Sequence, residues 1–164
     1  MKEVRAWVAL GSNLGDRRAT LEGAVEALRV ADEVEVLRVS PWFETEPVGG
    51  PVGQGKYLNG CLEAATTLEA RTFHWLLARI ETQFGRDRTR EVVDGPRTLD
   101  LDLLFFGAVE LAGPDLILPH PRLEERLFVL EPLCALAPEL RLPRCGRTVR
   151  ERVAELHALA RGGA

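Results

Sequence analysis

Residues 86–106 read RDRTREVVDGPRTLDLDLLFF, and the rest of the chain is best understood from this stretch. Its second half alternates leucine at positions 99, 101 and 103 with aspartate at positions 100 and 102. Successive side chains of a strand point to opposite faces, so the pattern predicts a strand with the leucines on one face and both carboxylates on the other. Residues two apart rise by roughly 6.6 Å along a strand, so the carboxylates lie close together and parallel.

The aspartate pair indicates a binding site for a divalent cation. Aspartate is depleted in strands, and two like charges on one face repel each other unless a cation lies between them. Mg²⁺ prefers oxygen ligands and is usually shared with substrate phosphates. The first half of the stretch carries Arg86, Arg88, Arg90 and Arg97. Because guanidinium groups bind phosphate oxygens in a bidentate way, the whole stretch predicts a site for phosphoryl chemistry.

A plain structural interpretation competes with this one. The aspartates are also compatible with the solvated face of an antiparallel sheet, and the arginines with a solvated surface loop. A lone D-x-D motif favours that interpretation. In GPRTLDLD, however, glycine, proline, arginine and both aspartates follow in a fixed order where a loop enters a strand, and this order favours a functional site.

The composition predicts one soluble globular domain over residues 1–164. The net charge of −4 gives no general attraction to nucleic acid. The three cysteines are odd in number and widely spaced, which is typical of free thiols in a reducing cytosol. The N-terminus lacks the apolar core of a signal peptide, and no stretch approaches 18 apolar residues. We therefore expect a cytoplasmic protein without a membrane partner, and we expect it to be a monomer.

Turn residues and hydrophobic periodicity predict the element order β-α-β-β-α-β. Strands are predicted at residues 4–10, 34–43 and 57–66 and in the leucine–aspartate segment, and helices at residues 16–30 and 66–84. Thr66 and Glu69 match a capping box at the start of the second helix. This order defines an α+β, ferredoxin-like fold, in which an antiparallel sheet carries two helices on one face.

The C-terminal part of the chain predicts an extension that covers part of the other face. A tight reversal leads into a short edge strand near residues 109–111. Two short helical segments are expected, one holding Arg126 and Phe128 and one ending at Leu136. A last helix, opened by a capping box at Thr148–Glu151, has an inner face formed by Val149, Val153, Leu156 and Ala160. What the helices leave open is the floor of a cleft.

Four features outside the opening stretch have a structural and a functional interpretation each. The turn GSNLG at residues 11–15 matches neither the phosphate-binding GxxxxGK[ST] nor the dinucleotide GxGxxG motif, so a structural turn is favoured. Tyr57 and Asn59 share a strand face, and they either hold a flat heterocycle or are a packed tyrosine and a surface asparagine. Glu81 is either solvated or meets the arginine loop. His120 lies between two prolines and is either structural or a donor to phosphates.

Several ordered motifs carry a resemblance to one family. They are GPRTLDLD, ALGSNLG near the start, YLN at residues 57–59, RIExxxGR at 79–86 and LPH…RxF from 118 to 128. With these motifs the chain resembles the 6-hydroxymethyl-7,8-dihydropterin pyrophosphokinases of folate biosynthesis. That family transfers pyrophosphate from ATP to the pterin hydroxymethyl group and releases AMP, with two Mg²⁺ ions. The resemblance implies an enzyme whose small-molecule substrates are ATP and the pterin.

By position, the resemblance also implies roles for the phosphate-binding residues. Both aspartates are expected to ligate both metal ions, and two arginines to neutralise the triphosphate during transfer. The residues implied in metal binding and catalysis are Asp100, Asp102, Arg86 and Arg97. The residues implied in ATP binding are Arg88, His120, Arg126 and, through its backbone, Leu103.

The pterin is implied to lie between two aromatic rings, with an amide and a loop backbone against its polar edge. The residues are Tyr57 and Phe128 for the rings, Asn59 for the amide, and Thr45, Pro47 and Val48 for the loop. Relatives commonly carry a basic residue and tryptophan before GPR, where this chain has Val93 and Asp94, so the closure of the lid loops at 48–53 and 86–95 is expected to differ. Pro121 stands where an aromatic residue often follows the histidine, so a nucleotide contact is expected to be missing.

Two other function classes stay open at this point. One is a non-catalytic ferredoxin-like module that binds a nucleotide or metabolite. The other is a Mg²⁺-dependent kinase that acts on another acceptor.

Overall fold

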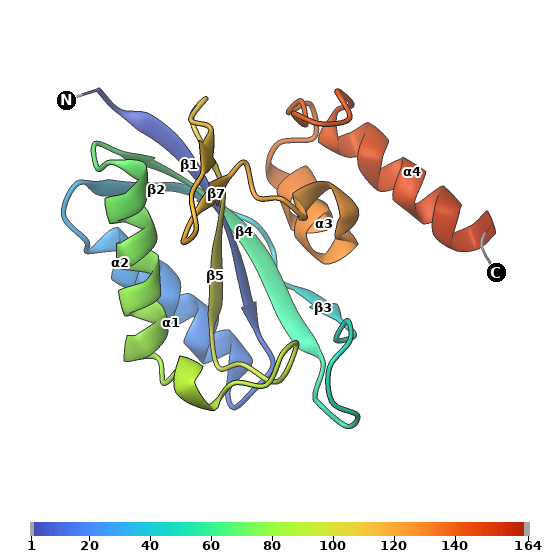
Figure 1. The fold of residues 1–164 in the computed structure, drawn as a ribbon, viewed down its shortest axis with the longest axis horizontal. Coiled ribbons are helices and arrows are strands. Elements are labelled where there is room, and N and C mark those ends of the chain that lie inside the picture. Colours follow the sequence, from blue (N-terminus) through green and yellow to red (C-terminus); the bar gives the residue numbers. More distant parts are fainter. Residues whose placement is uncertain (1, 163–164) are drawn as a thin grey trace.

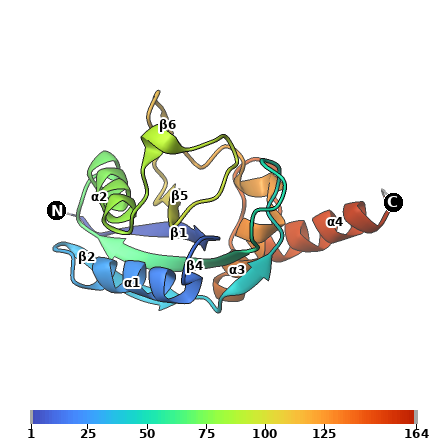
Figure 2. The ribbon, with the colours of Figure 1, turned by 90° about the horizontal axis from the view of Figure 1, so that it is seen from below.

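Figures 1 and 2 show the computed structural model, which describes residues 2–162 as an antiparallel sheet with helices on both faces. In chain order the elements are β1 (Val4–Ser12), α1 (Arg17–Arg29), β2 (Val34–Val39), β3 (Phe43–Thr45), β4 (Tyr57–Thr66), α2 (Ala70–Gln83), the 3₁₀ turn η1 (Arg88–Arg90), β5 (Asp100–Phe106), β6 (Leu111–Ala112), β7 (Ile117–Leu118), the 3₁₀ turn η2 (Leu123–Glu125), α3 (Leu127–Leu136) and α4 (Val149–Gly162). No helix among the described residues is long and apolar enough to cross a membrane.

The main sheet has the strand order β2-β4-β1-β5, and every neighbouring pair is antiparallel. The short strand β3 continues the sheet by pairing with the start of β4. With α1 and α2 inserted after β1 and β4, this is the predicted ferredoxin-like β-α-β-β-α-β topology, and the α+β fold class is confirmed. The α1 and α2 helices lie on one side of the sheet and the α3 and α4 helices on the other (Figure 1).

The two faces of the sheet are covered by two separate apolar clusters. Alternation along β1 sends Ala6, Val8 and Leu10 into the larger cluster, beneath α1 and α2, and Trp7 into the smaller one, beneath α3. The smaller cluster covers only part of its face. The rest of that face stays open, as predicted, and it holds the candidate site described below.

A bulge in β5 sets which face each of its side chains occupies. The register with β1 shifts between Trp7 and Val8, so Leu104 and Phe105 both pack in the smaller cluster, and Phe106 returns to the larger one. Upstream of the bulge the strict alternation holds. Both aspartates therefore face away from the buried leucines, on the open face, as the sequence predicts.

The predicted strand at residues 34–43 is wrong in one respect, because it is two strands. β2 ends at Val39, and Pro41, which has no N–H to donate, lies in the break before β3. Ser40 holds the break in place, since its N–H donates to the Cys61 carbonyl and its Oγ accepts from the Cys61 N–H at 2.9 Å. β3 is thereby set apart from β2 and can border the open face.

Helix boundaries correct two further predictions. The capping box at Thr66 is wrong: Thr66 ends β4, its Oγ1 donates to the Glu33 carbonyl at 2.6 Å, and α2 begins at Ala70 without a side-chain cap. The two short helical segments form one helix, α3, with Pro132 inside it. An interior proline removes one intrahelical hydrogen bond and crowds the preceding turn, yet α3 continues through Pro132 to Leu136.

The hairpin and α4 are each predicted in part. The strand after Phe106 exists as β6, yet it pairs with β7 in a separate two-stranded sheet and not with the main sheet. The Thr148–Glu151 capping box at the start of α4 is confirmed, with both reciprocal bonds at 3.1 Å. Val149 is buried, whereas Ala160 is exposed and does not belong to the inner face, because α4 extends beyond the body of the molecule (Figure 2).

A close contact between Trp42 and Gly60 holds β3 against β4, and it predicts a stability effect. A Cβ placed on Gly60 lies 2.3 Å from the Trp42 ring. We expect Gly60→Ala to lower the free energy of unfolding by about 1–3 kcal/mol in urea titration, as overpacking does. In a Trp42→Leu background the same change should cost little. An equal loss in both backgrounds would show that the ring contact is not the cause.

Candidate active site

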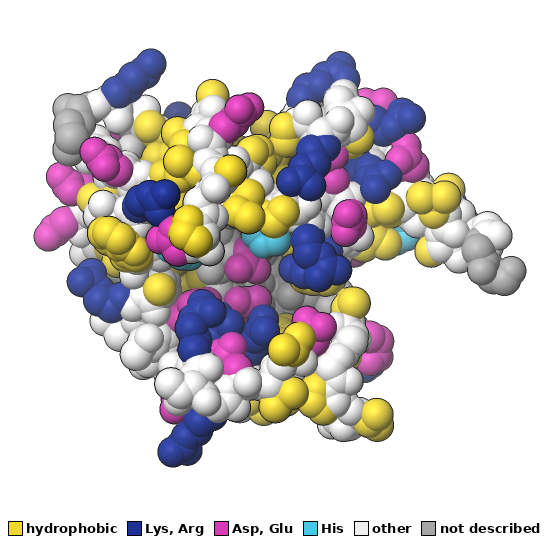
Figure 3. Space-filling view, in the orientation of Figure 1, with side chains coloured by type: hydrophobic (Ala, Val, Ile, Leu, Met, Phe, Trp, Pro, Cys, Tyr) yellow, Lys and Arg dark blue, Asp and Glu magenta, His cyan; other side chains and the backbone are white. Residues whose placement is uncertain are grey.

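The open face of the sheet holds a cavity of about 410 Å³, a volume typical of small-molecule sites. Strands β1, β4 and β5 form its floor, and its walls come from the loops before β4 and β5 and from the start of α3. The structure brings the following predicted residues together around it: Thr45, Val48, Tyr57, Asn59, Arg97, Asp100, Asp102, Arg126 and Phe128. In Figure 3, acidic side chains lie at the bottom of a hollow with arginine or lysine side chains at its rim.

A second, smaller cavity of about 240 Å³ adjoins Asp102 on its other side. It is lined by three of the residues predicted to bind ATP, namely Arg88, Leu103 and His120. Asp102 lines both cavities, so it stands where they meet. Two predicted residues, Pro47 and Arg86, line neither cavity.

The two aspartates differ in their surroundings. Asp100 accepts a hydrogen bond from Arg86 Nη1 at 2.9 Å and lies 3.6 Å from Arg97 Nη1. The Asp102 carboxylate makes no hydrogen bond or ion pair with any described residue. Burial, and then the negative charges of Asp100 and Glu81, raise the pKa of Asp102 to about 7. The charges of Arg126 and Arg86 lower this pKa but do not offset the effects that raise it.

The acidic pair fits a hard divalent ion shared with substrate. Within residues 2–162 no group of three or more acidic, histidine or cysteine side chains is arranged to hold a metal by itself. Two carboxylates therefore supply only part of a coordination shell, and the remaining positions fall to water and ligand oxygens. This donor set is typical of Mg²⁺ at phosphate-binding sites and unlike a structural metal site.

Glu81 is not solvated; it meets the arginine loop. Only 2% of its side chain is exposed, and its carboxylate accepts hydrogen bonds from Arg86 Nη1, Arg88 Nη2 and the Leu101 N–H at 2.5, 2.7 and 2.8 Å. Burial raises the pKa of Glu81, and the bonds from Leu101 and Arg86 act in the opposite direction. This carboxylate therefore ties the end of α2 to β5.

Arg86 lies behind the aspartates, away from the cavity. Its side chain is 5% exposed and donates to Glu81, to Asp100 and, through a bidentate pair at 2.6 and 2.9 Å, to Glu91. Arg97 lines the cavity, and its Nε lies 3.5 Å from Glu91 Oε1. The two arginines predicted to act on phosphate thus flank the same loop carboxylate, and their catalytic role stays a prediction.

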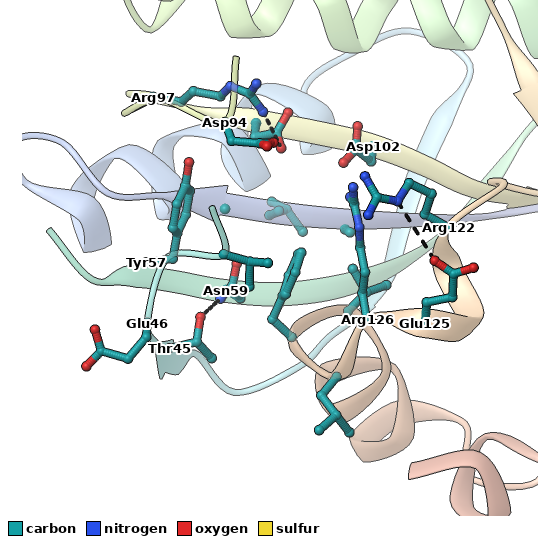
Figure 4. Close-up of a pocket in the computed structure, with 18 residues that line it drawn as sticks. Thr45, Glu46, Tyr57, Asn59, Asp94, Arg97, Asp102, Arg122, Glu125 and Arg126 are labelled. Atoms are coloured by element: carbon teal, nitrogen blue, oxygen red, sulfur yellow. Dashed lines mark hydrogen bonds and ion pairs between the residues drawn. The ribbon is translucent and has the colours of Figure 1, made fainter. Parts of the chain in front are cut away.

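A second group of cations enters the cavity from the segment before α3. Figure 4 shows Arg122 and Arg126 side by side, with their guanidinium groups directed toward Asp102. Arg126 also lies over the Phe128 ring, 5.5 Å from its centroid. Arg122 was missed by the sequence reasoning, although its position two residues after His120 was an available signal. Three acidic residues that line the cavity were missed as well: Glu46, Asp94 and Glu125.

His120 is held as a neutral hydrogen-bond donor. Its Nδ1 accepts from the Arg122 N–H at 3.2 Å, so the ring proton of the neutral form lies on Nε2. Burial, and then the charge of Arg126, lower the pKa of His120 to about 4. The His120 N–H donates to the Leu104 carbonyl, which fixes the residue against β5.

At the opposite end, the cavity presents a ring and an amide. Asn59 is buried and is not a surface residue; its Nδ2 donates to Thr45 Oγ1 at 2.5 Å. The Tyr57 hydroxyl donates to the Gly95 carbonyl at 3.4 Å. Gly11 lies beneath them, and a Cβ there would be 3.0 Å from Asn59 Oδ1, so the glycine leaves room for the amide.

The turn at residues 11–15 is structural, as favoured from the sequence, and it joins the two lid loops. Asn13 Oδ1 accepts from the Arg97 N–H at 2.8 Å, and Asn13 Nδ2 donates to Gln54 Oε1 at 3.1 Å. Gln54 Nε2 in turn donates to the Asp94 carbonyl at 2.9 Å. The loop before β4 and the loop before β5 are therefore connected through Asn13 and Gln54.

The fold and the site define a ferredoxin-like α+β protein with an acidic strand end framed by arginines. A sequence model of 7,8-dihydro-6-hydroxymethylpterin-pyrophosphokinase (HPPK) matches residues 7–138. A Bacillus subtilis protein named 2-amino-4-hydroxy-6-hydroxymethyldihydropteridine pyrophosphokinase is 44% identical over 82% of this chain and 79% of its own length. Its Pseudomonas aeruginosa namesake is 42% identical over 85% and 84%. The chain belongs to the 7,8-dihydro-6-hydroxymethylpterin-pyrophosphokinase family.

Solved structures agree in fold. The wild-type Plasmodium falciparum HPPK-DHPS with pteroate has a TM-score of 0.76 at 13% identity and is matched by 98% of this chain. The wild-type protein with pterin and p-hydroxybenzoate has a TM-score of 0.72 at 15% identity. This chain spans 44% and 43% of those two chains, so the likeness is to a part of each.

Proposed function

We propose that this chain transfers pyrophosphate from ATP to the hydroxymethyl group of 6-hydroxymethyl-7,8-dihydropterin, giving AMP and the pterin diphosphate. One observation carries the proposal: Asp100 and Asp102 share a strand face where two cavities meet. A metal-bound phosphate chain at that junction can extend into one cavity while its acceptor occupies the other. Family membership supports the same reaction.

The larger cavity is the proposed pterin site. A pterin is flat and has a polar edge of alternating donors and acceptors. The rings of Tyr57 and Phe128 supply apolar faces, and the Asn59 amide offers both a donor and an acceptor. Thr45 already bonds to Asn59, so it fixes the direction of the amide.

The smaller cavity is the proposed nucleotide site. Leu103 and Leu116 give it an apolar wall suited to adenine, and His120 and Arg88 supply donors for phosphates. Because the neutral His120 carries its proton on Nε2, it can donate to a phosphate oxygen without adding charge. Arg126 reaches the junction from the other side.

We assign two Mg²⁺ ions to Asp100 and Asp102. When bound, Mg²⁺ neutralises phosphate charge and aligns the reacting oxygens. The pterin hydroxyl would release its proton to solvent as its oxygen forms a bond to the β-phosphorus, while the bond from the β-phosphorus to the α,β-bridging oxygen breaks and AMP leaves with that oxygen. The protein contributes position and charge: Arg97 on one side and Arg122 and Arg126 on the other surround the transferred group.

The proposal also covers the domain organisation, the oligomeric state and the cellular location of the protein. We assign residues 1–164 to one pyrophosphokinase domain that acts as a monomer in the cytoplasm. Asp100, Tyr57, Phe128 and His120 line the two cavities within one copy of the chain, so the proposed site needs no residue from a second copy.

A single assay tests the function against its alternatives. The protein is incubated with Mg-ATP and the hydroxymethyl dihydropterin, and nucleotides are separated by chromatography. We expect AMP in equal amount to the pterin diphosphate, and no AMP when EDTA is added. ADP would indicate a kinase of another type, and unchanged ATP would indicate a binding module; either result would contradict the proposal.

A further inference from the structure

Glu81 is a buried carboxylate that has no role in the proposed reaction so far, and three hydrogen-bond donors converge on it. Arg86, Arg88 and the Leu101 N–H come from the arginine loop and from β5. Burying a carboxylate costs several kcal/mol unless its bonds are well made, and an apolar residue of similar size is often no less stable there. Because burying this charge is costly, the presence of Glu81 here indicates a role other than packing.

The bond to Leu101 acts on the strand between the two aspartates. β5 lies at the edge of the sheet, so every second N–H along it has no partner strand. At Leu101, which separates Asp100 from Asp102, the Glu81 carboxylate takes the place of that strand at 2.8 Å. Glu81 thereby fixes the backbone that sets the spacing of the two carboxylates.

The bond to Arg86 acts on Asp100 directly. Arg86 Nη1 lies 2.5 Å from Glu81 and 2.9 Å from Asp100 Oδ1, so one nitrogen is shared by both acids. Arg86 therefore binds Asp100 Oδ1, and the other carboxylate oxygen, Oδ2, faces Arg97. Moving or neutralising Glu81 would let this guanidinium turn further onto Asp100 and occupy the metal ligand.

We propose that Glu81 is a positioning residue: it holds Leu101 and Arg86 so that the carboxylates of Asp100 and Asp102 keep the spacing and direction needed to bind divalent ions. The inference rests on the proposed function, since it deepens the role given to the aspartate pair. Glu81 borders the smaller cavity, but its carboxylate is already bound by Arg86, Arg88 and the Leu101 N–H, so the role we assign to it is to hold these groups in place.

Glu81→Gln tests the inference, because glutamine keeps the shape and loses the charge and one acceptor. The control is Glu69→Gln on the same helix, whose side chain is exposed and makes no capping bond. Calorimetry measures the binding of a non-hydrolysable ATP analogue at a series of Mg²⁺ concentrations, without pterin or turnover. We expect the Mg²⁺ concentration that gives half-maximal binding of the analogue to rise about 10-fold or more in Glu81→Gln. An effect of this size is typical when a residue that hydrogen-bonds to a metal ligand is removed. We expect no change in Glu69→Gln.

Two further measurements separate positioning from mere stability. Turnover is determined below the melting temperature and divided by the folded fraction from circular dichroism; we expect it to fall about 10–100-fold, with the pterin KM unchanged. In an Arg86→Ala background, Glu81→Gln should have a much smaller effect. Wild-type Mg²⁺ dependence and turnover per folded molecule in Glu81→Gln overturn the inference, even when its stability falls. If the wild-type protein forms no AMP, the proposed function fails instead.

Discussion

We expect Asp102→Asn to lower the turnover number by about 10³-fold, an effect of the size seen when one electrostatic contact to the transition state is lost. The asparagine has the same shape, but it removes the negative charge of Asp102, which, unlike Asp100, forms no ion pair with a described arginine. Steady-state release of AMP is the measurement. Near-normal turnover in Asp102→Asn would remove the proposed metal role.

The same substitution should make the metal-free protein more stable. Burial and neighbouring acids raise the pKa of Asp102 from 3.8 to about 7, so the folded protein binds this proton more tightly than the unfolded chain does. The destabilising charge is absent below about pH 3.8, grows up to about pH 7 and is fully present above. Thermal melts in EDTA should therefore give Asp102→Asn a higher Tm than wild type at pH 8, and the difference should vanish toward pH 4.

A matched control makes both results interpretable. Glu22→Gln also removes one carboxylate, but from an exposed pair with Arg18 on α1. We expect neither its turnover nor its Tm to change by a measurable amount, since exposed pairs contribute little. A gain of stability without loss of turnover in Asp102→Asn would mean that this carboxylate is a strained structural residue and not a ligand.

Arg97→Ala gives the second large effect, and it falls on the chemical step. The guanidinium lines the cavity beside Asp100, and its Nε is buried without a hydrogen-bond partner among the described residues. A donor that gains a partner only when charge develops stabilises the transition state more than the ground state. We expect single-turnover rates to fall about 10²–10³-fold. The Kd for the ATP analogue, from calorimetry, should rise by less than about 10-fold, the change that 1.4 kcal/mol produces.

Two companion variants sharpen this test. Arg97→Lys keeps the charge but loses the fork-shaped donor, so only part of the rate should return. Arg90→Ala removes an arginine of the same loop whose side chain is 88% exposed and pairs with Asp87, so both constants should stay near wild type. Equal losses of rate and affinity in Arg97→Ala would show that the residue only binds.

Local patterns predicted the parts of the molecule that depend on neighbours in sequence. Alternation placed Asp100 and Asp102 opposite the buried leucines, because a strand has only two faces and the leucines must be buried. Element order then predicted the topology, since few arrangements satisfy β-α-β-β-α-β. The Thr148 capping box also depends only on a residue three positions away, and it was confirmed.

Contacts between distant segments were beyond such reasoning. Glu81 could not be assigned, because its burial depends on β5 lying beside the end of α2. Thr66 has the residue types of a capping box, but its hydroxyl is used by Glu33 in another loop. Arg122 has no periodic signal, and only the position of the segment before α3 directs it into the cavity. In each case tertiary packing decided between local alternatives of similar free energy.

The bidentate pair between Glu91 and Arg86 has a consequence for how nucleotide arrives. The Glu91 carboxylate binds the Arg86 guanidinium and lies 3.5 Å from Arg97 Nε, so it places an anion beside the arginine that is proposed to face the transferred group. A triphosphate that binds Arg97 must therefore first displace the Glu91 carboxylate. Nucleotide binding and release of the loop at residues 91–95 would then be one step, in which phosphate oxygens replace the Glu91 carboxylate. The net charge around the arginines would change little.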